Sequence, residues 1–270
     1  MQEYGVGVFP SVPTKSAWKK ALKKKRVKVN GHLAHTATYL KGGEKIELSL
    51  AEETPSCKTL VFDLKVLFED DYLAIIHKPA GILVSGNSFK TIANALPQNL
   101  KPCDVSDATK PQPVHRLDYA TTGLLLTGKT GSSIRKLNQL FEEKKVHKVY
   151  YATTIGKMPL SGKITDPIDD KAAESHFETV RSVPSKKYEY LNLVKLAPKT
   201  GRRHQLRKHL SAMGNPILGD KTYGKEGFIL MGKGLYLHAY SLEFIHPFTG
   251  EHLKVTDDLP ERFTKIFGEL

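Results

Sequence analysis

The feature of this sequence that most constrains its fold is a series of short apolar segments, each ended by glycine, proline or polar residues. Residues 72–77 are mostly apolar and stop at Lys78-Pro79-Ala80-Gly81, which predicts a buried strand followed by a turn. Strand composition recurs in the leucine run after Gly123 and in residues 149–155, 188–196 and 236–246.

Helices are expected at irregular intervals between these strands. Apolar residues at helical spacing predict helices over residues 132–145 and 204–213. Residues 97–113 carry four prolines and several small polar residues, so we expect a loop there. Because strands dominate, the sequence predicts an α+β fold built on a mixed, largely antiparallel sheet.

Length and composition exclude several classes of protein. The chain has 270 residues, of which 40% are hydrophobic and 26% charged, enough for one large domain and a small one with buried cores. It has no apolar run of bilayer length and no signal-peptide pattern at its start, so we expect no membrane partner. Cys57 and Cys103 cannot form a disulfide framework or a four-thiolate zinc site. We therefore expect a cytoplasmic protein, and a monomer.

The charge of the chain points to a polyanionic partner. Its formal net charge is +13, and residues 15–28, KSAWKKALKKKRVK, hold eight basic residues and no acidic one. Basic proteins bind nucleic acids because each neutralised phosphate releases a condensed counterion. Charge alone leaves open whether this run binds nucleic acid or is a solubilising surface.

The basic run is expected to belong to a small folded unit. Ala17, Trp18, Ala21 and Leu22 share one face of a predicted helix, with the lysines on the other face. A short strand over residues 27–31 ends in an Asn-Gly turn, and residues 40–48 predict a turn and a second strand. Residues 51–56 are short, polar and contain a proline, as a domain boundary should be. We therefore expect a small α/β domain with its linker over residues 1–58 and a large domain over residues 59–270.

Residues 14–50 resemble the αL RNA-binding domain named after a ribosomal small-subunit protein, through the helix, KKRVKVNG and KGGEKIEL. The usual Arg-Leu-Asp start of that family is not visible in GVGVFPSVP. The resemblance implies RNA binding by this segment, and a degenerate copy that only packs on its neighbour is the alternative.

Two loops of the large domain carry unusual chemistry. In the first, Asp118 follows His115 and Arg116 and precedes two threonines, which suits either an Asx-turn with a surface ion pair or a site. The second, GRRHQLRKHL over residues 201–210, places His204, Arg207 and Lys208 within one helical turn. These three side chains could face a phosphate or carboxylate together, or form a solvated helix face.

Five motifs in chain order give the large domain a family resemblance. YLAIIHKPAGILV, HRLDYATTGLLLTGKT, HKVYYATTIG, GRRHQLRKHLSAMGNPILGDKTYG and LYLHAYSLEFIHPFTGEHL resemble the RluA-type pseudouridine synthases over roughly residues 66–262. His77, Thr122 and Arg203 depart from the residues usual in that family. The resemblance implies an enzyme that isomerises uridine to pseudouridine in structured RNA, without a cofactor.

The resemblance also assigns roles to single residues. It makes Asp118 the catalytic aspartate, Arg207 its cation and Tyr150 the active-site tyrosine, whose ring can stack on the base and whose hydroxyl could assist proton loss. Arg116, beside His115, is placed to fill the space that a flipped base leaves. Further substrate contacts are expected from Leu237, His238, Arg202 and Lys78, the last two to phosphate.

The chemistry explains why one carboxylate and one guanidinium suffice. Cleaving the glycosidic bond leaves positive character on the anomeric carbon, which a carboxylate can attack or stabilise. Burial would raise the pKa of Asp118, so a fixed cation must keep it ionised. We therefore predict an Asp118–Arg207 ion pair with the two groups within about 6 Å. No metal is expected, because the sequence has no HExxH, and His204 and His209 are poorly spaced as ligands.

Four alternatives remain open at the level of sequence. The RNA could be ribosomal or transfer RNA, and the small basic domain favours ribosomal RNA. A non-catalytic RNA-binding or ribosome-assembly protein would keep the fold without activity. A DNA-binding regulator lacks a helix-turn-helix, and a glycosidase-like hydrolase would need a second carboxylate.

Overall fold

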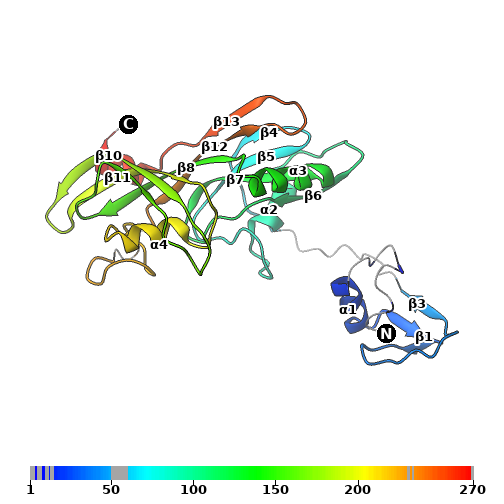
Figure 1. Cartoon of the computed structure of the whole chain (residues 1–270). Helices are drawn as coiled ribbons and strands as arrows, with labels where there is room; N and C mark the ends of the chain where they lie inside the picture. Colours follow the sequence, from blue (N-terminus) through cyan, green and yellow to red (C-terminus); the bar gives the residue numbers. More distant parts are fainter. Residues whose placement is uncertain are drawn as a thin grey trace. The chain divides into compact units, whose positions relative to one another are not determined.

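The structure is a computed structural model that describes residues 4, 8, 9, 12, 15–49, 60–229, 232 and 234–268. The chain divides into two compact units, Met1–Lys58 and Thr59–Leu270 (Figure 1). The linker expected at residues 51–56 lies outside the described residues.

The small unit is a helix and a three-stranded antiparallel sheet. Helix α1 (Lys15–Lys23) buries Trp18, Ala21 and Leu22, so the predicted helix and its apolar face are confirmed. The sheet has the order β2-β1-β3, and its strands are β1 (Val27–Val29), β2 (His32–Leu33) and β3 (Ile46–Leu48). Asn30 and Gly31 both have positive φ values, 48° and 82°, as a tight hairpin turn requires. The sequence pattern does not predict strand β2, which has only two residues.

The large unit is built on a ten-stranded sheet. Its main path has the order β4-β5-β7-β12-β8-β11-β10-β9, with β13 paired to β12 and β6 paired to β7. The strands are β4 (Val66–Glu69), β5 (Leu73–Lys78), β6 (Ala108–Pro113), β7 (Thr122–Thr130), β8 (His147–Ile155), β9 (Ser161–Ile164), β10 (Ser175–Ser185), β11 (Glu189–Pro198), β12 (Leu237–Ile245) and β13 (His252–Thr256). Among these described strands, β7 and β12 pair in parallel and the other pairs are antiparallel. The predicted mixed, largely antiparallel sheet is confirmed.

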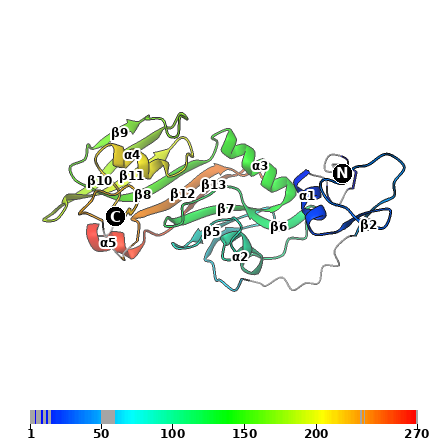
Figure 2. The ribbon, with the colours of Figure 1, turned by 90° about the horizontal axis from the view of Figure 1, so that it is seen from below.

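Two helices cover opposite faces of the β5–β7 half of the sheet (Figure 2). The faces differ because successive side chains of a strand point to opposite sides. Helix α2 (Ile92–Asn99) packs on the face that carries Ala74, Ile76 and Leu125. Helix α3 (Gly131–Glu142) packs through Leu137 on the face that carries Leu73, Ile75, Leu124 and Leu126.

The other half of the sheet has its own core. Helices α4 (Gln205–Ala212) and α5 (Glu261–Phe267) contribute Leu206, Leu210 and Phe263 to a cluster with residues of β8 and β11. The two halves meet where β12 lies between β7 and β8. Side chains at the start of β7 and in the middle of β8 are therefore brought together near the centre of the sheet.

The loop predicted over residues 97–113 is wrong at both ends. Helix α2 extends to Asn99 and contains Pro97 beyond its first turn, where a proline costs the helix one backbone hydrogen bond. Strand β6 contains Pro111 and Pro113, and it pairs with β7 alone among the described strands. Proline is compatible with such an edge strand because one side of the strand has no ladder to complete.

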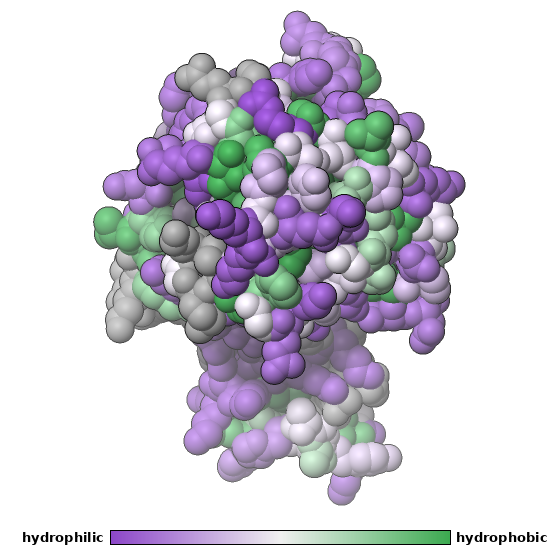
Figure 3. Space-filling view, turned by 90° about the vertical axis from the view of Figure 1, so that its left-hand side faces the viewer, coloured by the Kyte–Doolittle hydropathy of each residue, from purple (hydrophilic) through white to green (hydrophobic). Residues whose placement is uncertain are grey.

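One face of the molecule is predominantly polar (Figure 3). Hydrophilic residues dominate the face shown in Figure 3, and apolar residues are scattered across it in small groups. No helix in the part of the chain that the structure describes is both long and apolar enough to cross a bilayer.

Candidate active site

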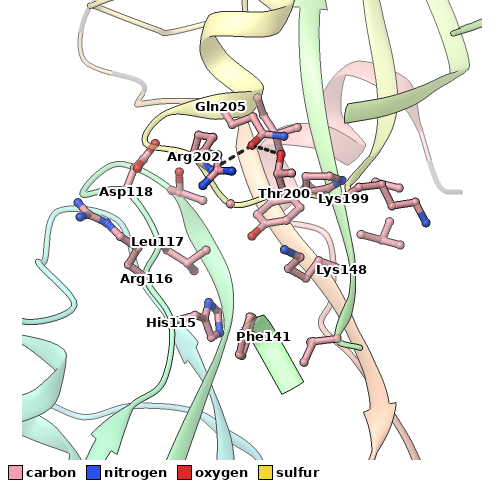
Figure 4. Close-up of a pocket in the computed structure, with 18 of the residues that line it drawn as sticks. His115, Arg116, Leu117, Asp118, Phe141, Lys148, Lys199, Thr200, Arg202 and Gln205 are labelled. Atoms are coloured by element: carbon pink, nitrogen blue, oxygen red, sulfur yellow. Dashed lines mark hydrogen bonds between the residues drawn. The ribbon is translucent and has the colours of Figure 1, made fainter. Parts of the chain in front are cut away.

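Three parts of the large unit surround a cavity of about 840 Å³. They are the segment that precedes β7, the middle of β8, and the loop that leads into α4 (Figure 4). Asp118, Tyr150 and Arg207 all line this cavity. The two loops singled out in the sequence therefore meet, although 89 residues separate Asp118 from Arg207.

The turn that carries Asp118 is fixed by backbone hydrogen bonds and by a buried lysine. The Thr121 N–H donates to the Asp118 carbonyl oxygen at 3.1 Å. Lys78 Nζ donates to the carbonyl oxygens of Pro79, Tyr119 and Thr121 at 2.9, 3.3 and 2.9 Å. Burial lowers the pKa of Lys78 to about 8, although the charge of Asp118 opposes this shift.

The expected contact between Lys78 and phosphate is contradicted by its burial. Its side chain is fully buried and its ammonium is committed to three carbonyl oxygens. A buried ammonium must be hydrogen-bonded within the protein, and this one holds the Asp118 turn rather than a substrate.

Gly123 allows the Asp118 turn to approach the centre of the sheet. It pairs with Ala239 at the parallel contact of β7 and β12 and has a φ of +109°. A Cβ at this position would lie 2.2 Å from the Ala239 carbonyl oxygen. Any other residue would separate the two strands directly behind the site.

Asp118 and Arg207 form the predicted contact. Arg207 Nη1 lies 3.4 Å from Asp118 Oδ2, and the two side chains are 9% and 16% exposed. The Asp118 carboxylate therefore borders the cavity, and the Arg207 guanidinium contacts it from within the protein. The guanidinium does not hold Asp118 in a bidentate manner, because its Nε–H and Nη2–H donors face another carboxylate.

Asp220 is that carboxylate, and no motif of the sequence predicts its role. Its oxygens accept from Arg207 Nε at 2.7 Å and from Arg207 Nη2 at 2.8 Å, and its side chain is 1% exposed. Burial alone would raise the pKa of Asp220, but the hydrogen bonds from Arg207 and from the Tyr223 and Thr222 N–H groups lower it. Asp220 thus fixes the plane of the guanidinium and leaves one N–H direction for Asp118.

His204 completes the wall next to Asp118. Its backbone is left-handed, with a φ of 56°, and its Nε2 lies 3.7 Å from Asp118 Oδ1. Its Nδ1 is hydrogen-bonded to the Tyr223 hydroxyl at 2.9 Å. Burial, with the nearby cations, lowers the pKa of His204 despite the charge of Asp118, so the ring is mainly neutral at neutral pH.

Tyr150 presents a neutral phenol to the cavity. Burial and the nearby charge of Asp118 raise the pKa of Tyr150 above its usual value. Its hydroxyl therefore stays protonated at neutral pH and can donate a hydrogen bond. Its half-buried ring also borders the cavity as an apolar surface.

Four of the remaining expected substrate residues line the cavity. Arg116 and Arg202 are exposed at the edge of the cavity, and His115 and Leu237 also line it. Burial lowers the pKa of His115 to about 3, and its Nε2 accepts from the Leu126 N–H at 2.9 Å, so its ring is neutral. These four residues are placed where a substrate could reach them.

The expected place of His238 in the cavity wall is wrong. Its side chain is fully buried and is absent from the cavity lining. Its Nδ1 is hydrogen-bonded to Thr122 Oγ1 at 2.9 Å, and burial lowers its pKa to about 4. The alternation of strand β12 explains this position, because Leu237 faces the cavity and the next side chain faces away.

The site is thus a carboxylate at the wall of a cavity, held by a guanidinium and flanked by a neutral phenol and a neutral imidazole. Such a carboxylate can attack or stabilise a carbon that becomes electron-deficient when its bond to a leaving group breaks. Among the described residues, no group of three or more His, Cys, Asp or Glu side chains is arranged to hold a metal ion.

Comparison with known proteins identifies the family of this chain. The sequence pattern of the RNA pseudouridylate synthase family matches residues 72–212. An uncharacterized RNA pseudouridine synthase of Aquifex aeolicus is 31% identical over 95% of this chain and 89% of its own length. Ribosomal large subunit pseudouridine synthase C of Pasteurella multocida is 37% identical over 79% of this chain and 70% of its own length.

A solved structure agrees with the sequence match. Human RNA pseudouridylate synthase domain containing 4 superposes with a TM-score of 0.62 and 27% identity, covering 74% of this chain and 90% of that one. Sequence and fold therefore agree, and the chain belongs to the RluA-type family of RNA pseudouridine synthases, isomerases that convert uridine to pseudouridine.

Proposed function

We propose that this enzyme modifies RNA of the large ribosomal subunit and that Asp118, Arg207 and Tyr150 carry the isomerisation. The ribosomal target is supported by the name of the Pasteurella multocida relative, a ribosomal large subunit pseudouridine synthase. The assignment of the site rests on one observation, the Asp118 carboxylate at the cavity wall in contact with Arg207.

The isomerisation exchanges one bond of the uracil ring for another. The bond between N1 and the anomeric carbon breaks, the base turns, and C5 forms the new bond to that carbon. C5 then loses its proton and N1 gains one, so no atom is added or removed. Asp118 would act on the sugar, as a nucleophile at the anomeric carbon or as a base toward the sugar, while Arg207 holds its carboxylate in place.

Tyr150 would hold the detached base while it turns. Its ring offers a stacking surface, and its protonated hydroxyl would serve as a hydrogen-bond donor to the uracil anion. A uridine in folded RNA must be flipped out to reach this depth, and unstacking it costs a few kcal/mol. Exposed Arg116, two residues before Asp118, would fill the space that the base leaves.

The small unit would add affinity for structured RNA. The lysines of α1 lie on the face opposite to buried Trp18, Ala21 and Leu22, where they can reach a phosphate backbone. This arrangement of a basic helix and a small sheet supports the resemblance to an αL RNA-binding domain.

Mapping of pseudouridine in cells with and without this gene tests the proposal. We expect the loss of at least one pseudouridine from large-subunit ribosomal RNA, its return on expression of the wild-type chain, and no return with Asp118→Asn. Loss confined to transfer RNA would refute the ribosomal target. Restoration by Asp118→Asn would refute the role of the carboxylate.

A further inference from the structure

The cavity continues beyond the group of residues that the isomerisation uses. Its lining extends along β8 from Tyr150 to Lys148 and on to Phe141, at the end of α3. Figure 4 shows Lys148 reaching into the cavity on the side of His115 and Phe141, across from Asp118 and Arg116. This second end of the cavity has no part in the steps assigned to Asp118, Arg207 and Tyr150.

Lys148 stands out among the cations that line the cavity. Arg116, Lys199 and Arg203 are exposed, so water solvates their charges. Lys148 is half-buried, and burial lowers the pKa of its ammonium. In the described part of the chain, no carboxylate lies within 4.0 Å of Lys148 Nζ, although Glu142 and Glu243 also border the cavity. Glu243 is instead paired with His252 at 3.0 Å and Lys254 at 3.6 Å.

The rings beside Lys148 form an aromatic surface. His115 stacks on Phe141 with a centroid distance of 4.8 Å and an interplanar angle of 29°. Lys148 Nζ lies 5.9 Å from the centroid of the Phe141 ring. The charge of Lys148 also contributes to the low pKa of neighbouring His115, whereas the charge of Asp118 affects Tyr150. The ammonium therefore belongs to the Phe141 end of the cavity and not to the reacting base.

We infer that Lys148, Phe141 and His115 form a second RNA subsite, called here the flanking subsite, which holds a nucleotide next to the target uridine. Lys148 binds the phosphodiester that joins the two nucleotides, and the ring pair offers a surface on which the neighbouring base stacks. A phosphodiester would neutralise the partly buried ammonium that the protein leaves without a carboxylate. The inference rests on the RNA substrate of this enzyme and not on its ribosomal identity.

The test uses a synthetic RNA hairpin around a uridine that the wild-type enzyme modifies. Three versions are compared: all phosphates intact, a neutral methylphosphonate 5′ of the uridine, and a neutral methylphosphonate 3′ of it. Wild type, Lys148→Met and Lys148→Arg are assayed on each version for KM and kcat. Lys265→Met is the control for the change in net charge, because Lys265 is an exposed lysine on α5 paired with Glu261.

We expect Lys148→Met to raise KM about tenfold on the intact hairpin with little change in kcat, as the loss of one charged hydrogen bond implies. One of the two neutral linkages should raise the KM of the wild type by a similar factor and leave the KM of Lys148→Met unchanged. The slope of log affinity against log salt should also fall by about one for this variant. Lys148→Arg should restore most of the affinity, and Lys265→Met should resemble the wild type.

The inference is overturned if each neutral linkage raises the KM of Lys148→Met by the same factor as it raises the KM of the wild type. It is also overturned if Lys148→Met lowers kcat and leaves KM unchanged, since the ammonium would then act on the reacting base. If the wild-type enzyme modifies a different class of RNA, the hairpin is taken from that RNA and the same comparison is made. The ribosomal proposal and the flanking subsite can therefore fail separately.

Discussion

Replacement of Asp220 by asparagine is the sharpest test of how the active site is held. Asp220 never contacts the cavity, yet it receives both paired N–H donors of Arg207. Asp220→Asn removes its charge and turns one acceptor into a donor that faces the guanidinium. Arg207 is then left with Asp118 as its remaining carboxylate partner among the described residues, and we expect it to rotate toward that group.

The expected loss can be estimated from burial. Removing one partner of a buried ion pair costs about 3–5 kcal/mol, and the amide retains one acceptor, so we expect about 3 kcal/mol. For a domain of this size the melting temperature should fall by about 6–12 °C. A displacement of about 1 Å in the group that orients the catalytic carboxylate should lower kcat about 10²-fold, with RNA affinity nearly unchanged.

The pH dependence of stability provides a second measurement. Because the pKa of Asp220 is lowered in the folded protein, its stabilisation is present above the usual aspartate pKa of 3.8 and is lost as the pH falls through the folded value. Asp220→Asn should therefore lose less stability than the wild type on acidification from about pH 6 to pH 3.

Asp169→Asn is the matched control. Its carboxylate is 65% exposed and pairs at 2.7 Å with Lys208, which follows Arg207 in helix α4. We expect a change within about 0.5 kcal/mol and an unaltered kcat. The reasoning is refuted if Asp220→Asn melts at a lower temperature but keeps the wild-type kcat, because Arg207 would then be oriented without Asp220.

Three further predictions concern other parts of the chain. Lys78→Met should lower kcat at least tenfold by releasing the Asp118 turn. Because the pKa of Lys78 falls from 10.5 to about 8 on folding, the stability of the wild type relative to this variant should rise by up to about 3 kcal/mol between pH 8 and 10.5, as measured by urea unfolding. Tyr150→Phe should lower kcat and preserve RNA binding in a filter assay. Because the pKa of Tyr150 is raised, the pH–rate profile of the wild type should show no limb from the phenol below pH 10. Trp18→Ala should unfold the small unit, because loss of a fully buried tryptophan costs about 3–5 kcal/mol, and calorimetry should show that the transition of the large unit is retained.

The strands could be predicted because their signal is local. An apolar run such as that after Gly123 needs burial on both faces, and all nine residues of β7 are buried. Helix α2 was hidden because Pro97 and its polar neighbours have the composition of a loop. Tertiary packing compensates for the low helix propensity of this segment, because Ile92, Ala95 and Leu96 pack against the sheet.

The site was only partly predictable for a related reason. Motifs identified Asp118 and Arg207, and the fold brings them within 3.4 Å. Sequence does not reveal which polar side chains become buried, so Lys78 and His238 were assigned to the substrate although they support the turn and the sheet. Asp220 was overlooked because its partner Arg207 lies on another element, and no spacing rule links a loop aspartate to a helix.

The central position of β12 has a consequence for the synthesis of the protein. Leu237–Ile245 lies between β7 and β8, whose last residues, Thr130 and Ile155, leave the ribosome long before it. Until then the edge of β8 that pairs with β12 and the Thr122–Gly123 end of β7 lack their strand partner, and an unpaired strand edge is a template for wrong association. A nascent chain that stops short of this strand can form local hairpins but cannot close the sheet around the carboxylate. Chaperones that shield exposed strand borders should therefore engage this chain late in translation and release it when β12 inserts.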